Sequence, residues 1–232
     1  MPKQHDTLLV AEVPCHIAES ESEKIITSDK VIKFLEDRKE LLMKLSKAVN
    51  RTIDNIYEIV LLWQSLEIES YQFNYWWTHV WTKEQQIKIM NQLDEIGGFL
   101  FDILWKNETI QKLRSGILIE QIYQNMKQRI NGTSNNRFYH YSAHDTTISP
   151  LLHLLGSFNN NSVPFGAAVI FELHQKENDF VKIYYLNDTY SDNPHLLNIG
   201  ICDGQIECPL NKFYQRIKKF FVNDFDAECG NQ

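Results

Sequence analysis

A histidine and an aspartate stand side by side at positions 144 and 145, inside the stretch YHYSAHDTTISPLL that covers residues 139–152. An imidazole and a carboxyl group can hydrogen-bond an anion and transfer protons once their surroundings adjust their pKa values. The short aromatic run before the pair is typical of a strand, and the apolar run behind Thr146 and Thr147 is typical of a helix. We therefore expect His144 and Asp145 at a strand end and a helix N-terminus, where ligands and phosphate oxygens bind in open α/β sheets.

The elements that must position this pair follow from the periodicity of the apolar residues. Spacing of three to four residues predicts helices over 28–49, 53–66, 82–100 and 116–130. After a polar loop, the pattern predicts a strand over 137–141, a helix that begins near Thr147, and a hairpin of 167–174 and 180–187. The late helix start keeps Pro150 out of the helix interior. Together these elements predict an α/β fold with a helical lobe over about 28–130 and an α/β core over 137–232.

Composition restricts the partners and the compartment of the chain. The net charge of −7 and the absence of a basic cluster argue against a nucleic-acid partner, and no apolar run is long enough to span a membrane. The first residues do not have the pattern of a signal peptide. Five Asn-x-Ser/Thr acceptors nevertheless favour a glycosylated protein that is secreted or lysosomal: Asn50, Asn107, Asn131, Asn160 and Asn187.

Four cysteines agree with an oxidising compartment. Cys202 and Cys208 flank a polar loop that a local disulfide could close, and Cys15 and Cys229 lie near the two ends of the chain. Four cysteines allow three pairings, and the spacing alone does not select one of them. The spacing does not suit a zinc site.

The segment Tyr141-Ser142-Ala143-His144-Asp145-Thr146-Thr147 resembles the second signature of the histidine acid phosphatases, a branch of the histidine phosphatase superfamily. The similarity extends to the segments around Gly116, Met126, 181–189 and 208–213, and covers essentially all of residues 1–232 as the C-terminal portion of one domain. It implies a phosphoglycerate-mutase-like α/β fold, incomplete in this chain. It also implies disulfides from Cys15 to Cys229 and from Cys202 to Cys208.

The resemblance further implies a hydrolysis of phosphomonoesters through a phosphohistidine. In the family, a histidine of an N-terminal Arg-His-Gly-x-Arg-x-Pro signature attacks phosphorus, and arginines of that signature hold the phosphoryl oxygens. Here His144 would bind the phosphate and Asp145 would protonate the leaving oxygen. Trp63 would either correspond to a tryptophan of the pocket or pack in a helix core. No Arg-His-Gly occurs in the sequence, so this chain is expected to supply half of a site and to be inactive by itself. The substrate would be a small-molecule or protein phosphomonoester. The reaction would need no cofactor and no metal, and the protein could form a homodimer.

Two other functions compete with this interpretation. The chain could be a secreted, non-catalytic phosphatase homologue that acts as a binding module. It could also be a metal phosphohydrolase of the HD-domain type, which needs further ligands on helices. His140 and His144 do not form a metal pair if the segment is extended, because four residues of strand separate them by roughly 13 Å.

Overall fold

The computed structural model describes residues 6–71 and 80–231. The chain divides into two compact units, and each is described by itself. The first consists of Met1–Ser22, Trp105–Asn159 and Val163–Gln232, and the second of Glu23–Leu104 with Asn160–Ser162. Among the described residues, helices joined to a small antiparallel sheet confirm the predicted α/β class. No helix within these residues is long and apolar enough to cross a membrane.

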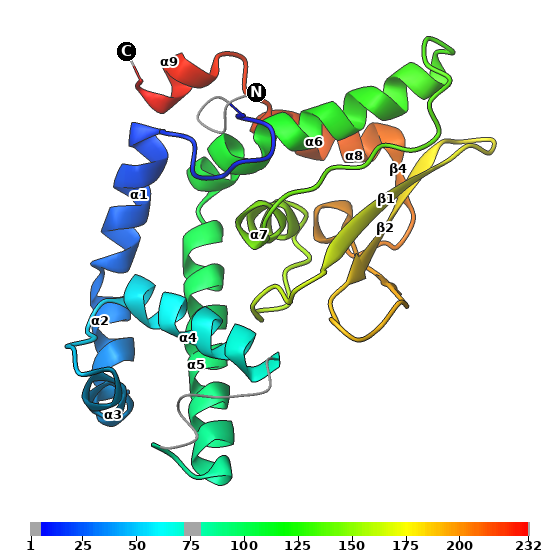
Figure 1. Cartoon of the computed structure of the whole chain (residues 1–232). Coiled ribbons are helices and arrows are strands. Elements are labelled where there is room, and N and C mark those ends of the chain that lie inside the picture. The colour runs from blue at the N-terminus through cyan, green and yellow to red at the C-terminus, as the bar shows by residue number, and fades with distance from the viewer. Residues whose placement is uncertain (1–5, 72–79, 232) are drawn as a thin grey trace. The chain divides into compact units, whose positions relative to one another are not determined.

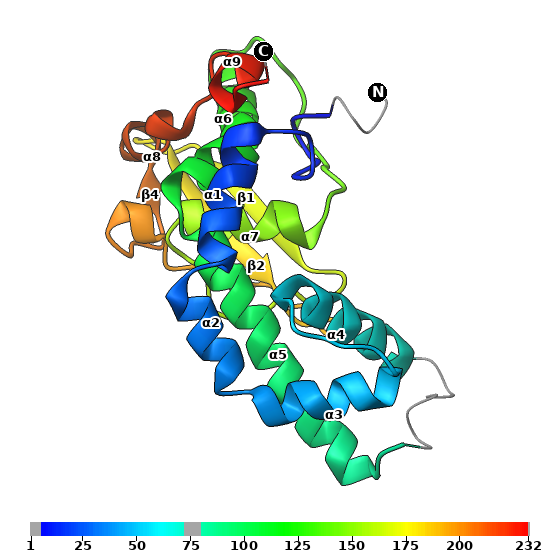
Figure 2. The same cartoon turned by 90° about the vertical axis from the view of Figure 1, so that its left-hand side faces the viewer.

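The second unit is helical. Its helices are α2 (Asp29–Glu36), α3 (Lys39–Val49), α4 (Ile56–Tyr71) and α5 (Lys83–Trp105), preceded by α1 (His16–Ile26), which begins in the first unit. Figure 2 shows α2, α3 and α4 arranged around α5. α5 begins where the sequence predicts, because the Gln85 N–H donates to Thr82 Oγ1 and the Thr82 N–H donates to Gln85 Oε1, a reciprocal capping box.

The single helix predicted over 28–49 is wrong, since two helices occupy this range. α2 ends at Glu36, and the Arg38 side chain turns back to donate a hydrogen bond to the carbonyl oxygen of Phe34 at 3.2 Å. The same guanidinium lies 3.6 Å from the centre of the Phe34 ring. These contacts give a hydrogen-bond donor to a backbone carbonyl group at the end of α2, and the chain changes direction before α3 begins.

The first unit contains the sheet and the helices that cover it. Its elements after α1 are α6 (Glu108–Ile130), α7 (Asp145–Leu154), β1 (Ala168–His174), β2 (Phe180–Leu186), β3 (His195–Leu196), η3 (Gly200–Cys202), β4 (Cys208–Pro209), α8 (Leu210–Ile217), η4 (Lys218–Phe220) and α9 (Phe225–Cys229). β1 and β2 form the predicted hairpin, in a register that pairs Ala168 with Leu186 and His174 with Phe180. β3 and β4 pair with the opposite edge of β2.

One apolar core holds this unit together. It joins Ile119 and Ile122 of α6, Leu152 of α7, Ile183 of β2 and Phe213 of α8 in a single cluster. α7 therefore packs against α6 and shares this core with the sheet, and Figure 1 shows α7 next to α6.

α6 begins at Glu108, eight residues before the predicted start. Its cap is Asn107, whose Oδ1 accepts hydrogen bonds from the N–H groups of Thr109 and Ile110. The first two turns mix polar and apolar residues, so their periodicity is weaker than that of the later turns.

The strand predicted over 137–141 is wrong. Residues 135–144 are not assigned to any strand or helix, and they pair with no strand among the described residues. Phe138 is 80% exposed. A strand needs a neighbour that satisfies its backbone, and the aromatic composition on which the prediction rested reports only a propensity.

Candidate functional site

His144 and Asp145 lie together at the start of α7, as the sequence predicts. His144 is the N-cap residue, with extended backbone and an exposed side chain, and Asp145 is the first residue of the helix. The helix begins at Asp145 and not near Thr147, and it accommodates Pro150 at its sixth position. Proline has no backbone N–H, so one hydrogen bond of the helix is missing at this position.

Thr147 ties this N-terminus to two parts of the chain. Its Oγ1 lies 3.4 Å from the backbone nitrogen of His144, which donates to it, and the same hydroxyl donates to the carbonyl oxygen of Leu9 at 2.7 Å. Thr147 is 3% exposed. The pair is therefore held by a buried side chain and not by a loop alone.

Asp145 has an environment that favours its protonated form. Burial raises the pKa of its carboxyl, the Glu12 carboxylate raises it further, and the hydrogen bond from the Thr146 N–H and the charge of His144 act in the opposite direction. That N–H donates to Asp145 Oδ1 at 2.7 Å. The net result is a raised pKa, which suits a group that donates a proton.

Helix N-termini generally present free backbone N–H groups, but here the N–H groups of Thr146 and Thr147 are both engaged. The Thr146 N–H is taken by Asp145, and the Thr147 N–H donates to the carbonyl oxygen of His144 at 3.0 Å. A phosphate oxygen would have to compete with the Asp145 carboxylate for the Thr146 N–H. Protonation of Asp145 would weaken that competition, because a neutral carboxyl is a poorer acceptor.

Glu12 is a residue of this site that the sequence did not reveal. Its Oε1 accepts a hydrogen bond of 2.9 Å from Thr146 Oγ1, although 134 residues separate the two along the chain. Glu12 belongs to no motif around Val10–Pro14, and only a long-range contact brings it to α7. Such a contact leaves no signal in the periodicity of one sequence.

Both disulfides implied by the resemblance are present. Cys15 is joined to Cys229, with Cα atoms 4.6 Å apart, and Cys202 is joined to Cys208, with Cα atoms 5.8 Å apart. All four sulfur-bearing side chains are fully buried. The first bridge ties the segment that contains Glu12 to the C-terminal helix α9.

Trp63 belongs to the second unit, where it lies in the helix core. Its side chain is 4% exposed, and its ring lies against Gly97 of α5 so closely that a Cβ at that glycine would stand 2.9 Å from the ring. The core packing accounts for this tryptophan. A role of Trp63 in binding substrate stays a prediction.

The five predicted glycosylation asparagines differ in their surroundings. Asn50, Asn131 and Asn160 are exposed, and Asn187 is partly buried. Asn107 is engaged, because its side chain caps α6 and its Nδ2 donates to Glu21 at 3.1 Å. A glycan on Asn107 would have to replace or share that donor.

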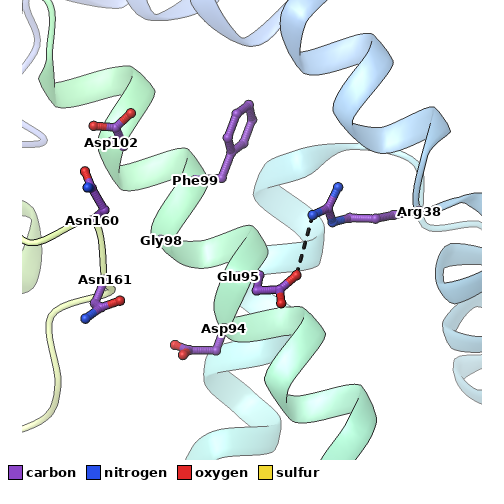
Figure 3. Close-up of a pocket in the computed structure, with 8 residues that line it drawn as sticks. All are labelled: Arg38, Asp94, Glu95, Gly98, Phe99, Asp102, Asn160 and Asn161. Atoms are coloured by element: carbon purple, nitrogen blue, oxygen red, sulfur yellow. Dashed lines mark ion pairs between the residues drawn. The ribbon is translucent and has the colours of Figure 1, made fainter.

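A polar pocket of about 380 Å³ lies in the second unit. Figure 3 shows the ion pair between Arg38 and Glu95 at its edge, with Asp94 and Asp102 on the same helix α5 and Asn160 opposite. The residues that line it include no histidine or cysteine. The pocket therefore offers no second acid and base pair of the kind formed by His144 and Asp145.

The raised pKa of Asp145 predicts the effect of Asp145→Asn on stability. As pH rises from acid, the unfolded chain ionises this carboxyl first, so the folded protein loses stability until its own raised pKa is passed. Asparagine does not ionise and avoids this loss. We expect Asp145→Asn to melt above the wild type at neutral pH, with a difference that shrinks as the pH falls toward about 4 in calorimetry.

Glu228→Gln is the matched control. A hydrogen bond from Lys112 is the main cause that lowers the pKa of Glu228, so this carboxylate stabilises the fold at neutral pH and its contribution disappears on acidification. Its replacement should lower the melting temperature at neutral pH. If Asp145→Asn also melted below the wild type at neutral pH, the environment assigned to Asp145 would be wrong.

Comparison with known proteins finds acid phosphatases. The chain is 29% identical over 154 residues to putative acid phosphatase 5 of Caenorhabditis elegans, across 65% of this chain and 36% of the relative. It is 30% identical over 150 residues to prostatic acid phosphatase of Rattus norvegicus, across 64% and 39%. It is 29% identical over 147 residues to lysosomal acid phosphatase of Xenopus laevis, across 61% and 33%. The aligned part is thus well under half of each relative.

The family model of the histidine phosphatase superfamily (branch 2) matches residues 7–186. This range is more than half of the chain, and it contains the segment with Glu12, the pair His144 and Asp145, and the β1/β2 hairpin. The chain belongs to the histidine phosphatase superfamily, branch 2.

Proposed function

We propose that this chain provides the phosphate-binding and proton-donating half of an acid phosphatase site that hydrolyses phosphomonoesters. The observation that carries the proposal is the placement of His144 and Asp145 at the N-terminus of α7, with a raised pKa on Asp145. A histidine that faces solvent can reach a phosphate oxygen, and a carboxyl that stays protonated in mild acid can act as a general acid. Membership of the superfamily and the similarity to acid phosphatases support the same chemistry.

Each residue has a defined role in the proposed reaction. A histidine supplied from outside these 232 residues attacks phosphorus, the bond between phosphorus and the ester oxygen breaks, and Asp145 transfers its proton to that oxygen as the alcohol leaves. His144 donates a hydrogen bond to a phosphoryl oxygen, on which negative charge accumulates. Water then attacks phosphorus and gives a proton to Asp145, while the bond between phosphorus and the histidine nitrogen breaks and releases inorganic phosphate and the free histidine.

The nucleophile and the arginines are the missing part of this proposal. The sequence contains no Arg-His-Gly, and the matched part covers only 33% to 39% of the three relatives named above. We infer that a segment with the Arg-His-Gly-x-Arg-x-Pro signature completes the site. The chain alone is expected to bind phosphate weakly and to turn over no ester.

The surroundings proposed for this protein are the secretory route or the lysosome. Two disulfides support an oxidising compartment during folding. The exposed acceptors Asn50, Asn131 and Asn160 support glycosylation. The substrate would be a small-molecule or protein phosphomonoester, and discrimination among these depends on the completed pocket.

A fusion tests the proposed function. The N-terminal part of a family member, carrying the Arg-His-Gly-x-Arg-x-Pro signature and ending where the alignment with this chain begins, is joined ahead of residue 7. We expect hydrolysis of 4-nitrophenyl phosphate in mild acid, and a loss of about 10²-fold or more in His144→Ala, because a preorganised donor to the phosphoryl group is removed.

The controls of the fusion separate a folding failure from a functional one. Ser115→Ala, a buried substitution in α6, should leave the rate unchanged. A fusion that melts cooperatively and binds inorganic phosphate but does not hydrolyse the ester would contradict the enzymatic role and favour the non-catalytic binding module. If the His144→Ala fusion were as active as the fusion with His144, the proposed role of His144 would be wrong.

A further inference from the structure

The segment of residues 6–15 is fixed to the start of α7 through several independent contacts. Thr147 Oγ1 donates to the Leu9 carbonyl oxygen, and Thr146 Oγ1 donates to Glu12 Oε1 at 2.9 Å. A few residues further on, Arg114 of α6 donates to the Val13 carbonyl oxygen. Cys15 then closes the bridge to Cys229. The backbone on both sides of Glu12 is therefore held, and this glutamate reaches α7 from a fixed position.

The Thr146 residue contacts both carboxyl groups of the site. Its backbone N–H donates to Asp145 Oδ1 at 2.7 Å, and its hydroxyl donates to Glu12 at 2.9 Å. Thr146 thus bridges Asp145 and Glu12, one through its main chain and one through its side chain. An alanine at this position would keep the first contact and lose the second.

The charged groups that act on Asp145 come from two elements. Glu12, from the segment before α1, acts on it with a like charge, and the neighbouring His144, at the start of α7, acts with the opposite charge when protonated. Arg114 of α6 interacts with Glu19 and with Glu12, so its charge partly compensates that of Glu12. Glu12 itself is exposed.

We propose that Glu12 is a positioning residue of the candidate site, which holds the Thr146 hydroxyl and keeps a negative charge beside Asp145. The inference rests on the proposed role of Asp145 as the proton donor. A neighbouring carboxylate makes ionisation of Asp145 less favourable, so the acid keeps its proton to a higher pH. The charge of Glu12 raises the pKa of Asp145, which agrees with this geometry.

Two contributions of Glu12 can be separated. Glu12→Gln keeps an oxygen that can accept from Thr146 and removes the charge, whereas Glu12→Asp keeps the charge and shortens the side chain. Thr146→Val keeps the shape of the residue and its N–H to Asp145 but removes the hydroxyl that holds Glu12. A residue that only stabilised the fold would change the melting temperature in these variants and leave the titration of Asp145 in place.

The test is a pH titration of the Asp145 side-chain carboxyl carbon by nuclear magnetic resonance in the isotope-labelled chain. We expect Glu12→Gln to move the midpoint to lower pH and Thr146→Val to move it in the same direction. Glu12→Asp should restore it in part, because the charge is kept on a shorter side chain. In the double variant Glu12→Gln with Thr146→Val, the midpoint should stay at the value of Glu12→Gln, because the two residues act as one unit.

Glu108→Gln is the matched control. Glu108 is an exposed glutamate that accepts a bond of 2.7 Å from Lys219, so its replacement changes the net charge by the same amount at another place. In the Glu108→Gln variant, the midpoint of the Asp145 titration should equal that of the wild type. A Glu12→Gln midpoint that equals the wild type, or that Glu108→Gln reproduces, overturns the proposal. The titration needs no enzymatic turnover. An inactive fusion would therefore refute the proposed function without affecting the result of the Asp145 titration.

Discussion

Loss of the bridge between Cys15 and Cys229 should destabilise the folded protein more than any single change at the surface. Its two cysteines are 214 residues apart, so the bridge restricts the unfolded chain over nearly its whole length. The loop-entropy relation gives about 5 kcal/mol for a loop of this size. The same bridge anchors the segment that holds Glu12 and Leu9 against α7. We therefore expect Cys15→Ala with Cys229→Ala to lower the free energy of unfolding by several kcal/mol.

The second disulfide is the natural control. Cys202 and Cys208 are 6 residues apart, and the same relation gives only about 2 kcal/mol for so short a loop. Denaturant unfolding of the two double variants, side by side with the wild type, measures the difference. A smaller loss without the Cys15 bridge than without the Cys202 bridge would show that the long bridge does not restrain the chain as described.

Gly116→Ala should be the most damaging single substitution inside a helix. A Cβ at this position of α6 would stand 2.0 Å from the carbonyl oxygen of Phe220 and 3.0 Å from a methyl group of Val222. Alanine normally favours a helix over glycine by about 1 kcal/mol. Here the clash is with backbone, which cannot rotate away, so we expect a net loss of about 3 kcal/mol or more.

Ser115→Ala, at the preceding position, provides the comparison. Ser115 is 1% exposed, and its hydroxyl has no hydrogen-bond partner among the described residues. Its removal should leave stability unchanged or raise it by about 1 kcal/mol. Thermal unfolding followed by circular dichroism measures both variants. If Gly116→Ala melted at or above the wild type, the close approach of η4 to α6 would be wrong.

The parts of the fold that the sequence predicted are those whose signals are local. The capping box of Thr82 and Gln85 marks the start of α5, and alternating residues in 180–187 mark β2. α1 was missed because its sequence is mostly polar and has no apolar stripe. A disulfide at Cys15 and a bond from the Cys15 N–H to Glu19 hold that helix, and both depend on its surroundings.

The candidate site divides in the same way. His144 and Asp145 were identified because adjacent residues and a helix cap form one local pattern. Glu12 was not identified, because it reaches Thr146 only after the chain has folded over 134 residues. The strand predicted over 137–141 was wrong for a related reason, since a strand is defined by a partner elsewhere in the chain. Local sequence therefore indicates the chemistry, and long-range contacts determine its environment.

The most direct test of the central claim is the dependence of Asp145→Asn on the leaving group. 4-Nitrophenolate leaves without a proton, whereas an alkyl alcohol must be protonated as it leaves. In the fusion that carries the Arg-His-Gly signature, we therefore expect Asp145→Asn to reduce kcat for glycerol 2-phosphate by about 10²- to 10⁴-fold and kcat for 4-nitrophenyl phosphate far less. Equal losses for the two esters would contradict the assignment of Asp145 as the residue that protonates the leaving oxygen.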